Sequence, residues 1–346
     1  MKKSFVKIAG IIAFVSGIAL VACGDDSSDG LPAEPSVAPS ELTSSESQAV
    51  ESSVSENPAV ETSSESTPEE PIAPIVAEES SASVETPAVG GYVPGTLEEE
   101  IAKDAPFVAA SAANATLQPL ADVYASLQPT ERVIFVLRHA RRGSSSTQET
   151  PLHNTGVVQS QELGAMIADG TPIFYAHSDY VRTRQTALNI FAGRGGDTTQ
   201  FVSTVVDKLA GGGYVKDSDL ISQYAEADFN KNQLKVFASW MYKEEYSDAF
   251  NDLTETSVAF LTQHILPAFP ADYRVGIMIS HDMTVAPLVA YCAALAVDFK
   301  AYESLAQWLG YLQGLAIIID ENGNRRYVPV NGLYGTYAYL DGVNQS

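Results

Sequence analysis

The sequence predicts an α/β protein: a three-layer α/β/α sandwich around a mixed, mainly parallel sheet, with a small helical cap insertion. Residues 133–137 and 275–279 are continuous apolar runs of strand length, bounded by polar residues. Such runs are typical of strands covered on both faces. Between them, strand-like and helix-like patterns alternate, and this alternation favours a sheet with helices on both sides.

The remaining elements follow from the spacing of apolar residues. Besides the two runs above, we expect helices over 155–167, 183–191 and 285–295 and strands over 173–176, 315–319 and 326–330. The helices have apolar residues at a period near 3.6, and the strands are short apolar runs. The last two strands flank an Asn-Gly pair, which is typical of a hairpin turn.

The stretch 193–272 has a different character. It contains the glycine run 211–213 and then a helical pattern rich in aromatic residues. We interpret it as a mostly helical cap inserted between two strands, with further core helices as the alternative. The glycine run lacks the Lys-Ser/Thr ending of a nucleotide-binding loop, so we interpret it as a flexible turn.

Residues 1–22 have the parts of a secretory signal. A short basic start precedes an apolar stretch over 8–21, which is too short for a comfortable transmembrane helix. The Leu-Val-Ala-Cys run that ends at Cys23 resembles the lipobox of bacterial lipoproteins and implies lipidation of Cys23. An ordinary signal peptide with a chance cysteine is the alternative. Gly24 rather than Asp follows, which resembles the sorting rule for outer-membrane delivery, so we expect a lipid-anchored protein of the cell envelope.

Residues 23–105 are expected to form a disordered acidic tether, rich in Ser, Pro and Glu. Between 24 and 105 there are 19 acidic residues and one basic residue. This composition cannot bury enough apolar surface to offset its ordering entropy. The net charge of −23 therefore lies mainly in the tether, since 24 acidic and 16 basic residues from Pro106 onward leave −8. This balance argues against nucleic-acid binding.

The folded domain is expected over 106–346, which is long enough for one large core. With Cys23 lipidated, the other cysteine, Cys292, has no partner within the chain. It lies in an apolar run, so we expect a buried structural thiol and a fold without disulfides.

Charged and polar side chains follow three of the predicted strands. They are Arg138, His139 and Arg142 after the first strand, Arg182 after the second, and His281 and Asp282 after the third. The carboxyl ends of parallel strands meet at one edge of a sheet, where ligands bind. We therefore expect these side chains to line one crevice.

The arginines and the first histidine suit phosphoryl transfer. Guanidinium groups neutralise a phosphate monoester through forked hydrogen bonds, a role we expect for Arg138, Arg142 and Arg182. His139 can attack phosphorus as a neutral imidazole, and a covalent intermediate then divides hydrolysis into two steps. Which ring nitrogen attacks depends on what holds the other nitrogen, and the sequence leaves this open.

The second histidine and its neighbour can assist that transfer. His281 can donate a hydrogen bond to a phosphoryl oxygen. Asp282, if held protonated, can protonate the leaving oxygen and later deprotonate water. The five histidines show no metal-ligand spacing, so we expect neither a metal nor another cofactor.

At these residues the chain resembles the histidine phosphatase superfamily, the group that contains phosphoglycerate mutase and the histidine acid phosphatases. The family's first motif is Arg-His-Gly, from which Ala140 departs. In the acid phosphatase branch another Arg lies two residues after the Gly. Arg142 stands at that position, with Arg141 as the alternative. Residues 178–187 resemble the segment with a further phosphate-binding Arg, which implies Arg182, and 280–288 resemble the His-Asp motif, which implies Asp282 as proton donor.

The resemblance spans 132–295 and implies a phosphoglycerate mutase-like fold. Residues 152–156 and 185–187 resemble the phosphoglycerate mutases more than the acid phosphatases. Assignment to the acid phosphatase branch therefore depends on Asp282 and Arg142. The expected function is hydrolysis of a small phosphorylated substrate outside the cytoplasm, through a phosphohistidine. The alternative is a non-catalytic surface lipoprotein that binds a phosphorylated or sugar ligand, although binding alone would need neither a nucleophile nor a proton donor. The sequence determines neither the ester nor the oligomeric state.

Overall fold

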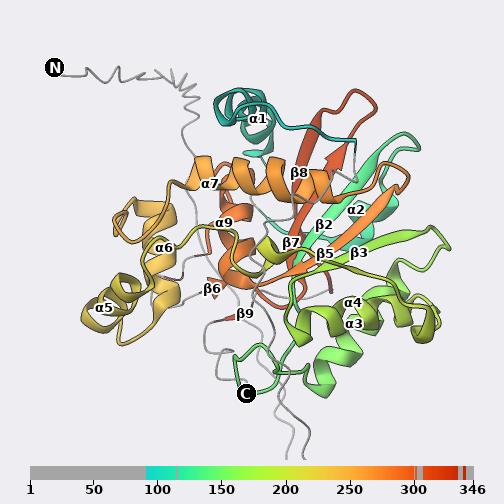
Figure 1. The fold of residues 1–346 in the computed structure, drawn as a ribbon, viewed down its shortest axis with the longest axis horizontal. Coiled ribbons are helices and arrows are strands. Elements are labelled where there is room, and N and C mark those ends of the chain that lie inside the picture. Colours follow the sequence, from blue (N-terminus) through green and yellow to red (C-terminus); the bar gives the residue numbers. More distant parts are fainter. Residues whose placement is uncertain (1–90, 114–115, 300, 302–306, 334–337, 340–346) are drawn as a thin grey trace, which may run out of the picture. The chain divides into compact units, whose positions relative to one another are not determined.

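A mixed seven-stranded sheet lies at the centre of the fold (Figure 1). The protein is seen in a computed structural model that describes residues 91–113, 116–299, 301, 307–333 and 338–339. The strand order is β1-β8-β7-β2-β5-β3-β4. Strand β7 runs antiparallel to both of its neighbours, and every other neighbouring pair is parallel. The predicted mixed, mainly parallel sheet is therefore confirmed.

The predicted strands all lie within observed ones. The strands of the sheet are β1 (Gln118–Pro119), β2 (Arg132–Arg138), β3 (Ile173–His177), β4 (Thr204–Val205), β5 (Val275–Ser280), β7 (Gln313–Ile319) and β8 (Arg325–Asn331). A separate antiparallel pair consists of β6 (Gln307–Trp308) and β9 (Ala338–Tyr339).

Helices and strands alternate from α1 to β4, after which α5 to α8 follow one another before β5. The helices are α1 (Leu97–Ser111), α2 (Leu120–Ala125), α3 (Asn154–Met166), α4 (Val181–Gly193), α5 (Ser218–Asp228), α6 (Gln233–Lys243), α7 (Leu253–Phe260), α8 (Leu266–Ala268) and α9 (Asp282–Cys292), with short turns η1 (Thr198–Gln200), η2 (Asp207–Ala210) and the π-helical η3 (Leu261–Ile265). Helix α9 begins three residues before the predicted 285, which places Asp282 in its first turn.

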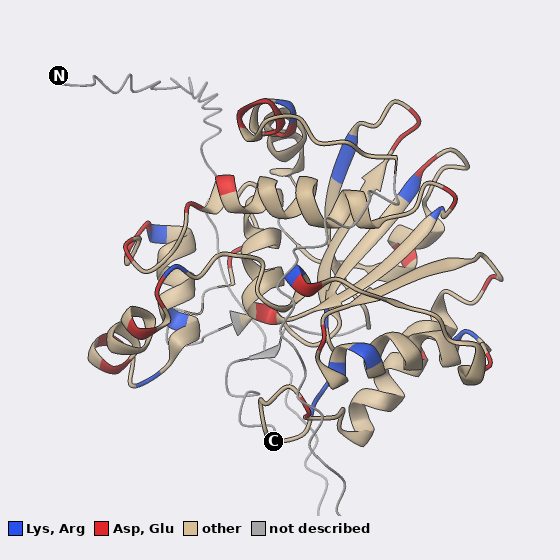
Figure 2. Cartoon of the chain, in the orientation of Figure 1, with Lys and Arg blue, Asp and Glu red and all other residues tan. Residues whose placement is uncertain are grey.

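Helices cover both faces of the sheet (Figure 1). Val133, Phe135 and Leu137 of β2 belong to one hydrophobic cluster, which includes residues of α3 and α4. Ile134 and Val136 belong to the other, which includes residues of α6, α7 and α9. Successive side chains of a strand point to opposite faces, so the fold has three layers. Figure 2 shows the middle of the sheet without acidic or basic residues, as burial between two helical layers requires.

The inserted stretch between β3 and β5 is helical, but only part of it stands apart from the main core. Strand β4 pairs with β3 at the sheet edge, and α7 packs against α1 and α9. Helices α5 and α6 project away from the sheet, at the left of Figure 1. Trp240 of α6 stacks on Phe250 with ring centroids 4.4 Å apart, and both belong to the core cluster beneath α9. The stretch 193–272 is therefore helical in large part, and both α6 and α7 contribute residues to the hydrophobic core.

Helix α1 corrects the predicted start of the folded domain. It begins at Leu97 behind a capping box in which Thr96 and Glu99 each bond the other's backbone N–H. Leu97 and Ile101 pack against the hydrophobic core. Residues 97–105 therefore belong to the domain, although their acidic composition continues that of the tether.

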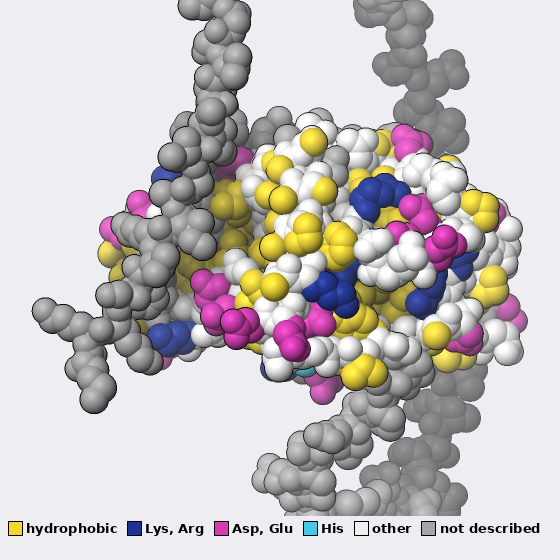
Figure 3. Space-filling view, turned by 90° about the horizontal axis from the view of Figure 1, so that it is seen from above, with side chains coloured by type: hydrophobic (Ala, Val, Ile, Leu, Met, Phe, Trp, Pro, Cys, Tyr) yellow, Lys and Arg dark blue, Asp and Glu magenta, His cyan; other side chains and the backbone are white. Residues whose placement is uncertain are grey.

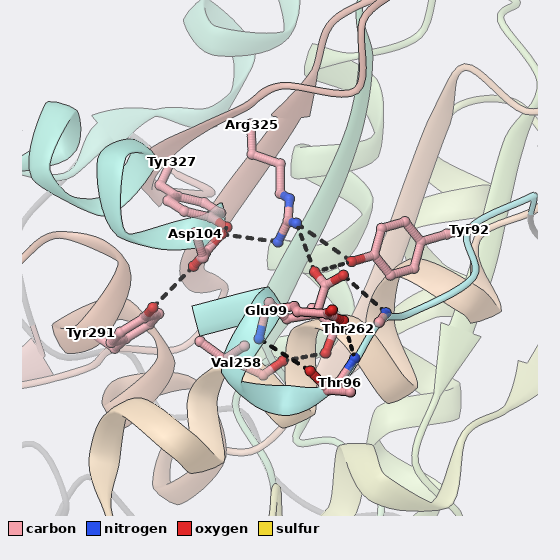
Figure 4. A network of polar contacts seen from close by, with 11 residues as sticks. Tyr92, Thr96, Glu99, Asp104, Val258, Thr262, Tyr291, Arg325 and Tyr327 are labelled. Atoms are coloured by element: carbon pink, nitrogen blue, oxygen red, sulfur yellow. Dashed lines mark hydrogen bonds and ion pairs between the residues drawn. The ribbon is translucent and has the colours of Figure 1, made fainter. Parts of the chain in front are cut away.

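A buried network of charges and tyrosines holds α1 against β8 and α9 (Figure 4). Arg325 of β8 lies 2.9 Å from Asp104 and 3.3 Å from Glu100, and none of the three side chains is more than 6% exposed. Tyr327 of β8 and Tyr291 of α9 donate hydrogen bonds to Asp104. Burial raises the pKa of Asp104, although Arg325 and the tyrosines oppose this. The network thus ties α1 to the helix that begins with Asp282.

The remaining predictions concern the N-terminal segment, a membrane-spanning helix and Cys292. The signal peptide over 1–22, lipidated Cys23 and the tether as far as residue 90 lie outside the described residues. Among the residues that the structure describes, no helix combines the length and the apolar character needed to cross a membrane. Cys292 is buried and free, which confirms the predicted structural thiol, and burial raises its pKa.

Candidate active site

Four strand ends meet at one rim of the sheet. Leu137 near the end of β2 pairs with Ile279 near the end of β5 and with Gly314 near the start of β7. His177 at the end of β3 also pairs with Ile279. The residues after β2, β3 and β5 and those before β7 are therefore neighbours. The predicted site residues that the structure brings to this rim are Arg138, His139, Arg142, Arg182, His281 and Asp282.

His139 is held as a neutral imidazole by two hydrogen bonds. Its Nδ1 lies 2.7 Å from the carbonyl oxygen of Ala140, and its Nε2 lies 3.2 Å from the donating Nε of Arg182. A carbonyl can only accept and a guanidinium can only donate, so we assign the proton to Nδ1 and the lone pair to Nε2. Burial, reinforced by the charge of Arg138, lowers the pKa of His139 well below its ordinary value. The nitrogen available as a nucleophile is thus Nε2.

Ala140 fits the loop after β2 without backbone strain. It is not one of the described residues with a positive φ, so a side chain at this position carries no left-handed penalty. Its side chain is fully buried, and its N–H donates to Oγ1 of Thr186 over 3.1 Å. The loop after β2 therefore accommodates Ala140 in place of the glycine of Arg-His-Gly.

Arg182 connects three parts of the rim. Besides its bond to His139, its Nη1 donates to the carbonyl of Thr147 over 2.8 Å and its Nη2 to Nδ1 of His281 over 3.3 Å. The ring of Tyr180 lies under the guanidinium, 4.3 Å from its central carbon. The side chain is buried, so a planar donor group is held in one orientation beside the nucleophile.

His281 takes part in a chain of hydrogen bonds with defined direction. Its Nδ1 accepts from Arg182, so its Nε2 carries the proton and donates to Oγ of Ser178 over 2.9 Å. Ser178 then donates to Oγ1 of Thr183 over 2.9 Å, and Thr183 donates to the carbonyl of Tyr180 over 2.7 Å. Burial and Arg182 lower the pKa of His281 to about 4. His281 thus orients Arg182 through Nδ1, and its own N–H is bound to Ser178.

Asp282 forms an ion pair with Arg138. Its Oδ2 lies 3.3 Å from Nη2 of Arg138. The other arm of Arg138 donates to the carbonyl of Leu309, and the ring of Tyr311 lies 4.3 Å from the guanidinium carbon. Burial would raise the pKa of Asp282, but Arg138, His281 and two N–H donors outweigh it and leave the pKa below its ordinary value. These contacts favour the carboxylate form of Asp282, whereas the predicted acid role requires a protonated carboxyl group.

The two candidate arginines of the loop differ in their surroundings. Arg142 donates to the carbonyls of Gly143 and Ser145, and its charge contributes to the lowered pKa values of Arg182 and His281. The backbone of Arg141 packs on α3, where a Cβ at Gly156 would lie 2.1 Å from the Arg141 carbonyl oxygen. Of the two arginines, Arg142 is therefore the one whose charge acts on Arg182 and His281.

The rim suits a small dianion. Arg182 is influenced by the charges of Arg138, Arg142 and Asp282, so positive charge exceeds negative charge among these four groups. The Nε of Arg138 is buried and has no hydrogen-bond partner within the described ranges, and such a donor is costly unless a ligand or water satisfies it. Nowhere in the described part of the chain do three or more His, Cys, Asp or Glu residues form a group that could hold a metal ion.

Sequence reasoning did not identify several residues of the rim. Trp308 donates from Nε1 to Oδ2 of Asp282 over 3.2 Å, and Tyr311 and Tyr180 stack on two of the arginines. Ser178 and Tyr180 follow β3 directly, so the strand-end rule that selected Arg182 applies to them as well. Trp308 and Tyr311 precede β7, and no sequence signal showed that β7 is antiparallel.

Charge on the outer surface is mixed. On the face shown in Figure 3, basic side chains form separate small groups beside acidic ones. A nucleic-acid backbone requires a continuous basic surface, and this face does not provide one.

No protein-family model matches the chain, and no curated protein matches it either. Among solved structures it is similar to YhfR from Bacillus stearothermophilus, with 16% identity, 59% of this chain and 98% of that chain covered, and a TM-score of 0.40. It is also similar to phosphoglycerate mutase from Bacillus anthracis str. Sterne, with 13% identity, 59% and 93% coverage and a TM-score of 0.37. A third is mycobacterial glucosyl-3-phosphoglycerate phosphatase in complex with inorganic phosphate, with 18% identity, 58% and 96% coverage and a TM-score of 0.35. Identities of this size do not determine which reaction a chain catalyses.

Proposed function

We propose that this chain hydrolyses phosphate monoesters through a phosphohistidine formed on Nε2 of His139. One observation carries the proposal: the unprotonated Nε2 of His139 accepts from Nε of Arg182, and both side chains are buried together with that of Arg138. A phosphoryl group that took the guanidinium hydrogen bonds would release the lone pair of Nε2 and lie next to it.

The proposed reaction has two balanced steps. In the first, Nε2 of His139 attacks phosphorus, the P–O bond to the ester oxygen breaks, and Asp282 gives its proton to that oxygen so that an alcohol leaves. In the second, water attacks phosphorus, the P–N bond breaks, and Asp282 takes a proton from the water. Inorganic phosphate then leaves, and both residues return to their starting states.

Substrate binding itself supplies a reason for Asp282 to become protonated. Its carboxylate is stabilised in part by Arg138, 3.3 Å away. A phosphate dianion that engages Arg138 draws this positive charge away and adds negative charge nearby, and both changes raise the pKa of Asp282. We therefore propose that phosphate binding is accompanied by proton uptake on Asp282.

Trapping the intermediate tests the function. The purified full-length protein, mixed with a phosphate ester labelled in its phosphoryl group and quenched in alkali, should retain label that acid removes, as a phosphohistidine does. His139→Ala should lose the label and nearly all hydrolysis of every ester. His153→Ala is the matched control, since His153 caps α3 at the surface, and it should keep both. Retained hydrolysis in His139→Ala would disprove the phosphohistidine and favour a different chemistry.

The alternative is a lipoprotein that binds a phosphorylated or sugar ligand without turnover. It predicts saturable phosphate binding with no hydrolysis of any ester by the unmodified protein. The pairing of a lone-pair nitrogen with a carboxylate in one site favours the enzyme, because binding alone needs neither group.

We also propose the acid phosphatase branch and an envelope location for the enzyme. The branch is supported by Asp282 at the start of α9 and by the charge of Arg142 near Arg182. The location is supported by the lipobox-like run that ends at Cys23, and the long acidic segment after it would hold the domain away from the membrane surface. Fractionation tests the location: Cys23→Ser should leave the membrane fraction, and a variant that stays there like the unmodified protein would exclude the lipid anchor.

A further inference from the structure

We propose that Trp308 is the positioning residue for Asp282: its indole N–H binds Oδ2 and so directs the acid–base chemistry to Oδ1. The inference rests on the proposed function and adds a residue that no motif of the sequence marks. Nε1 of Trp308 lies 3.2 Å from Oδ2 of Asp282. Nη2 of Arg138 lies 3.3 Å from the same oxygen.

The sharing of Oδ2 determines where a proton can reside. An oxygen that accepts from two donors is a poor place for a proton, so a proton that arrives on the carboxyl group is placed on Oδ1. Charged groups that act with Asp282 are Arg138 from β2 and Arg182 from α4, and His281 is the residue before it. Of the two donors to Oδ2, only the indole is neutral, and an anionic substrate does not compete for it.

This difference separates the roles of the two donors during turnover. Arg138 is expected to turn toward the phosphoryl group when substrate binds. Trp308 is 1% exposed and packs against Phe299 with ring centroids 5.7 Å apart, so its ring stays in place. Its hydrogen bond therefore holds the carboxyl group through both chemical steps.

Neighbouring residues within 308–312 also contact the residues of the rim. Leu309 accepts from Arg138, Tyr311 stacks on Arg138, and the N–H of Leu312 donates to the Arg138 carbonyl over 3.1 Å. The ring of Tyr311 also lies 5.7 Å from that of His139. Trp308 thus belongs to a segment that positions both the carboxylate and the arginine paired with it.

A pair of identical substitutions tests the inference. The chain has two tryptophans, and Trp240 lies in the cap, stacked on Phe250. Trp308→Phe keeps an aromatic ring and removes only the N–H donor. We expect kcat on an alkyl phosphate to fall about 10-fold, the size expected for one hydrogen bond to a charged group, with KM little changed. The alkaline limb of the kcat profile should move to higher pH, because a carboxylate that loses a donor has a higher pKa. Hydrolysis of p-nitrophenyl phosphate should change little.

Trp240→Phe should leave the pH dependence of kcat on the alkyl phosphate unchanged. If Trp308→Phe and Trp240→Phe have the same alkaline limb and the same ratio of rates on the two esters, the positioning role is excluded.

A spectroscopic measurement works even if Trp308→Phe does not fold or the protein does not turn over. Trp240→Phe leaves Trp308 as the single tryptophan, and its emission should titrate with Asp282 and respond to inorganic phosphate. Adding Asp282→Asn should abolish the acid titration. An unchanged titration in that double variant would show that Trp308 does not sense Asp282. The proposed function fails separately, through ester hydrolysis that survives His139→Ala.

Discussion

Nε of Arg182 donates a hydrogen bond to Nε2 of His139 over 3.2 Å, so the lone pair of the proposed nucleophile is bound by the proposed phosphate-binding group. The two residues come from different elements, with His139 after β2 and Arg182 in the first turn of α4. A phosphoryl oxygen that replaces this hydrogen bond puts phosphorus within reach of Nε2. The same contact keeps His139 unprotonated, because protonation would place two donors face to face.

Arg182→Lys should weaken binding of inorganic phosphate by about 10-fold or more, because lysine keeps the charge but loses the fork that reaches His139, Thr147 and His281. Arg184→Lys on the same helix is the control, since Arg184 is exposed. Calorimetric titration with phosphate measures both. Equal affinities in the two variants would show that Arg182 does not bind the phosphate.

Arg142→Lys should weaken phosphate binding more than Arg141→Lys. The charge of Arg142 acts on Arg182 and His281. A charge that acts on these two residues also attracts a phosphate bound beside them. The same titration compares the variants at one ionic strength, because surface charges are screened by salt. The opposite ranking would transfer the role to Arg141.

Asp282→Asn should lose about 10²–10⁴-fold in rate on an alkyl phosphate, the usual contribution of general acid catalysis. The loss on p-nitrophenyl phosphate should be much smaller, because a phenolate leaves without a proton. Steady-state rates on the two esters give the comparison. If both rates fall by the same factor, Asp282 is not the acid.

Stability should fall as pH decreases from above 6.5 toward 4. The pKa of His281 drops from 6.5 to about 4 in the folded protein, and that of His139 is also lowered. In this window the unfolded chain binds protons that the native protein excludes, so the stabilisation present above pH 6.5 is lost on acidification. Urea unfolding of His281→Asn should show a shallower pH slope than the unmodified protein. His153→Asn, an exposed cap position, should keep the original slope, and a slope in His281→Asn equal to this control would refute the assignment.

Arg325→Leu should lower the free energy of unfolding by about 3–5 kcal/mol, because it leaves Asp104 and Glu100 buried without their cation. The adjacent Arg326 has a half-exposed side chain 3.2 Å from Glu131, so Arg326→Leu should cost less than about 1 kcal/mol. Urea unfolding of both variants gives the difference. For the same reason a chain that starts at Pro106 should be markedly less stable than one that starts at residue 91, and equal stabilities would contradict the role of α1.

The sequence by itself determined the strands and which residues lie at their ends. Apolar runs such as 133–137 are visible because burial on both faces leaves no polar position within them. His139 and Asp282 follow such runs within three residues and Arg182 within six, and the carboxyl ends of parallel strands share one edge. The fold class and the positions of the predicted site residues therefore follow from local sequence patterns together with this rule.

Only the tertiary structure decided how those residues act. The unprotonated nitrogen of His139 is known because Ala140 and Arg182 contact opposite sides of the ring. Trp308 reaches Asp282 because β7 runs antiparallel to β2, which brings the residues before β7 to the same rim. Helix α1 belongs to the domain because Arg325, more than two hundred residues away in sequence, compensates its buried acids. Hydrogen-bond partners and burial depend on contacts between segments that are distant in sequence. Local composition does not predict these contacts.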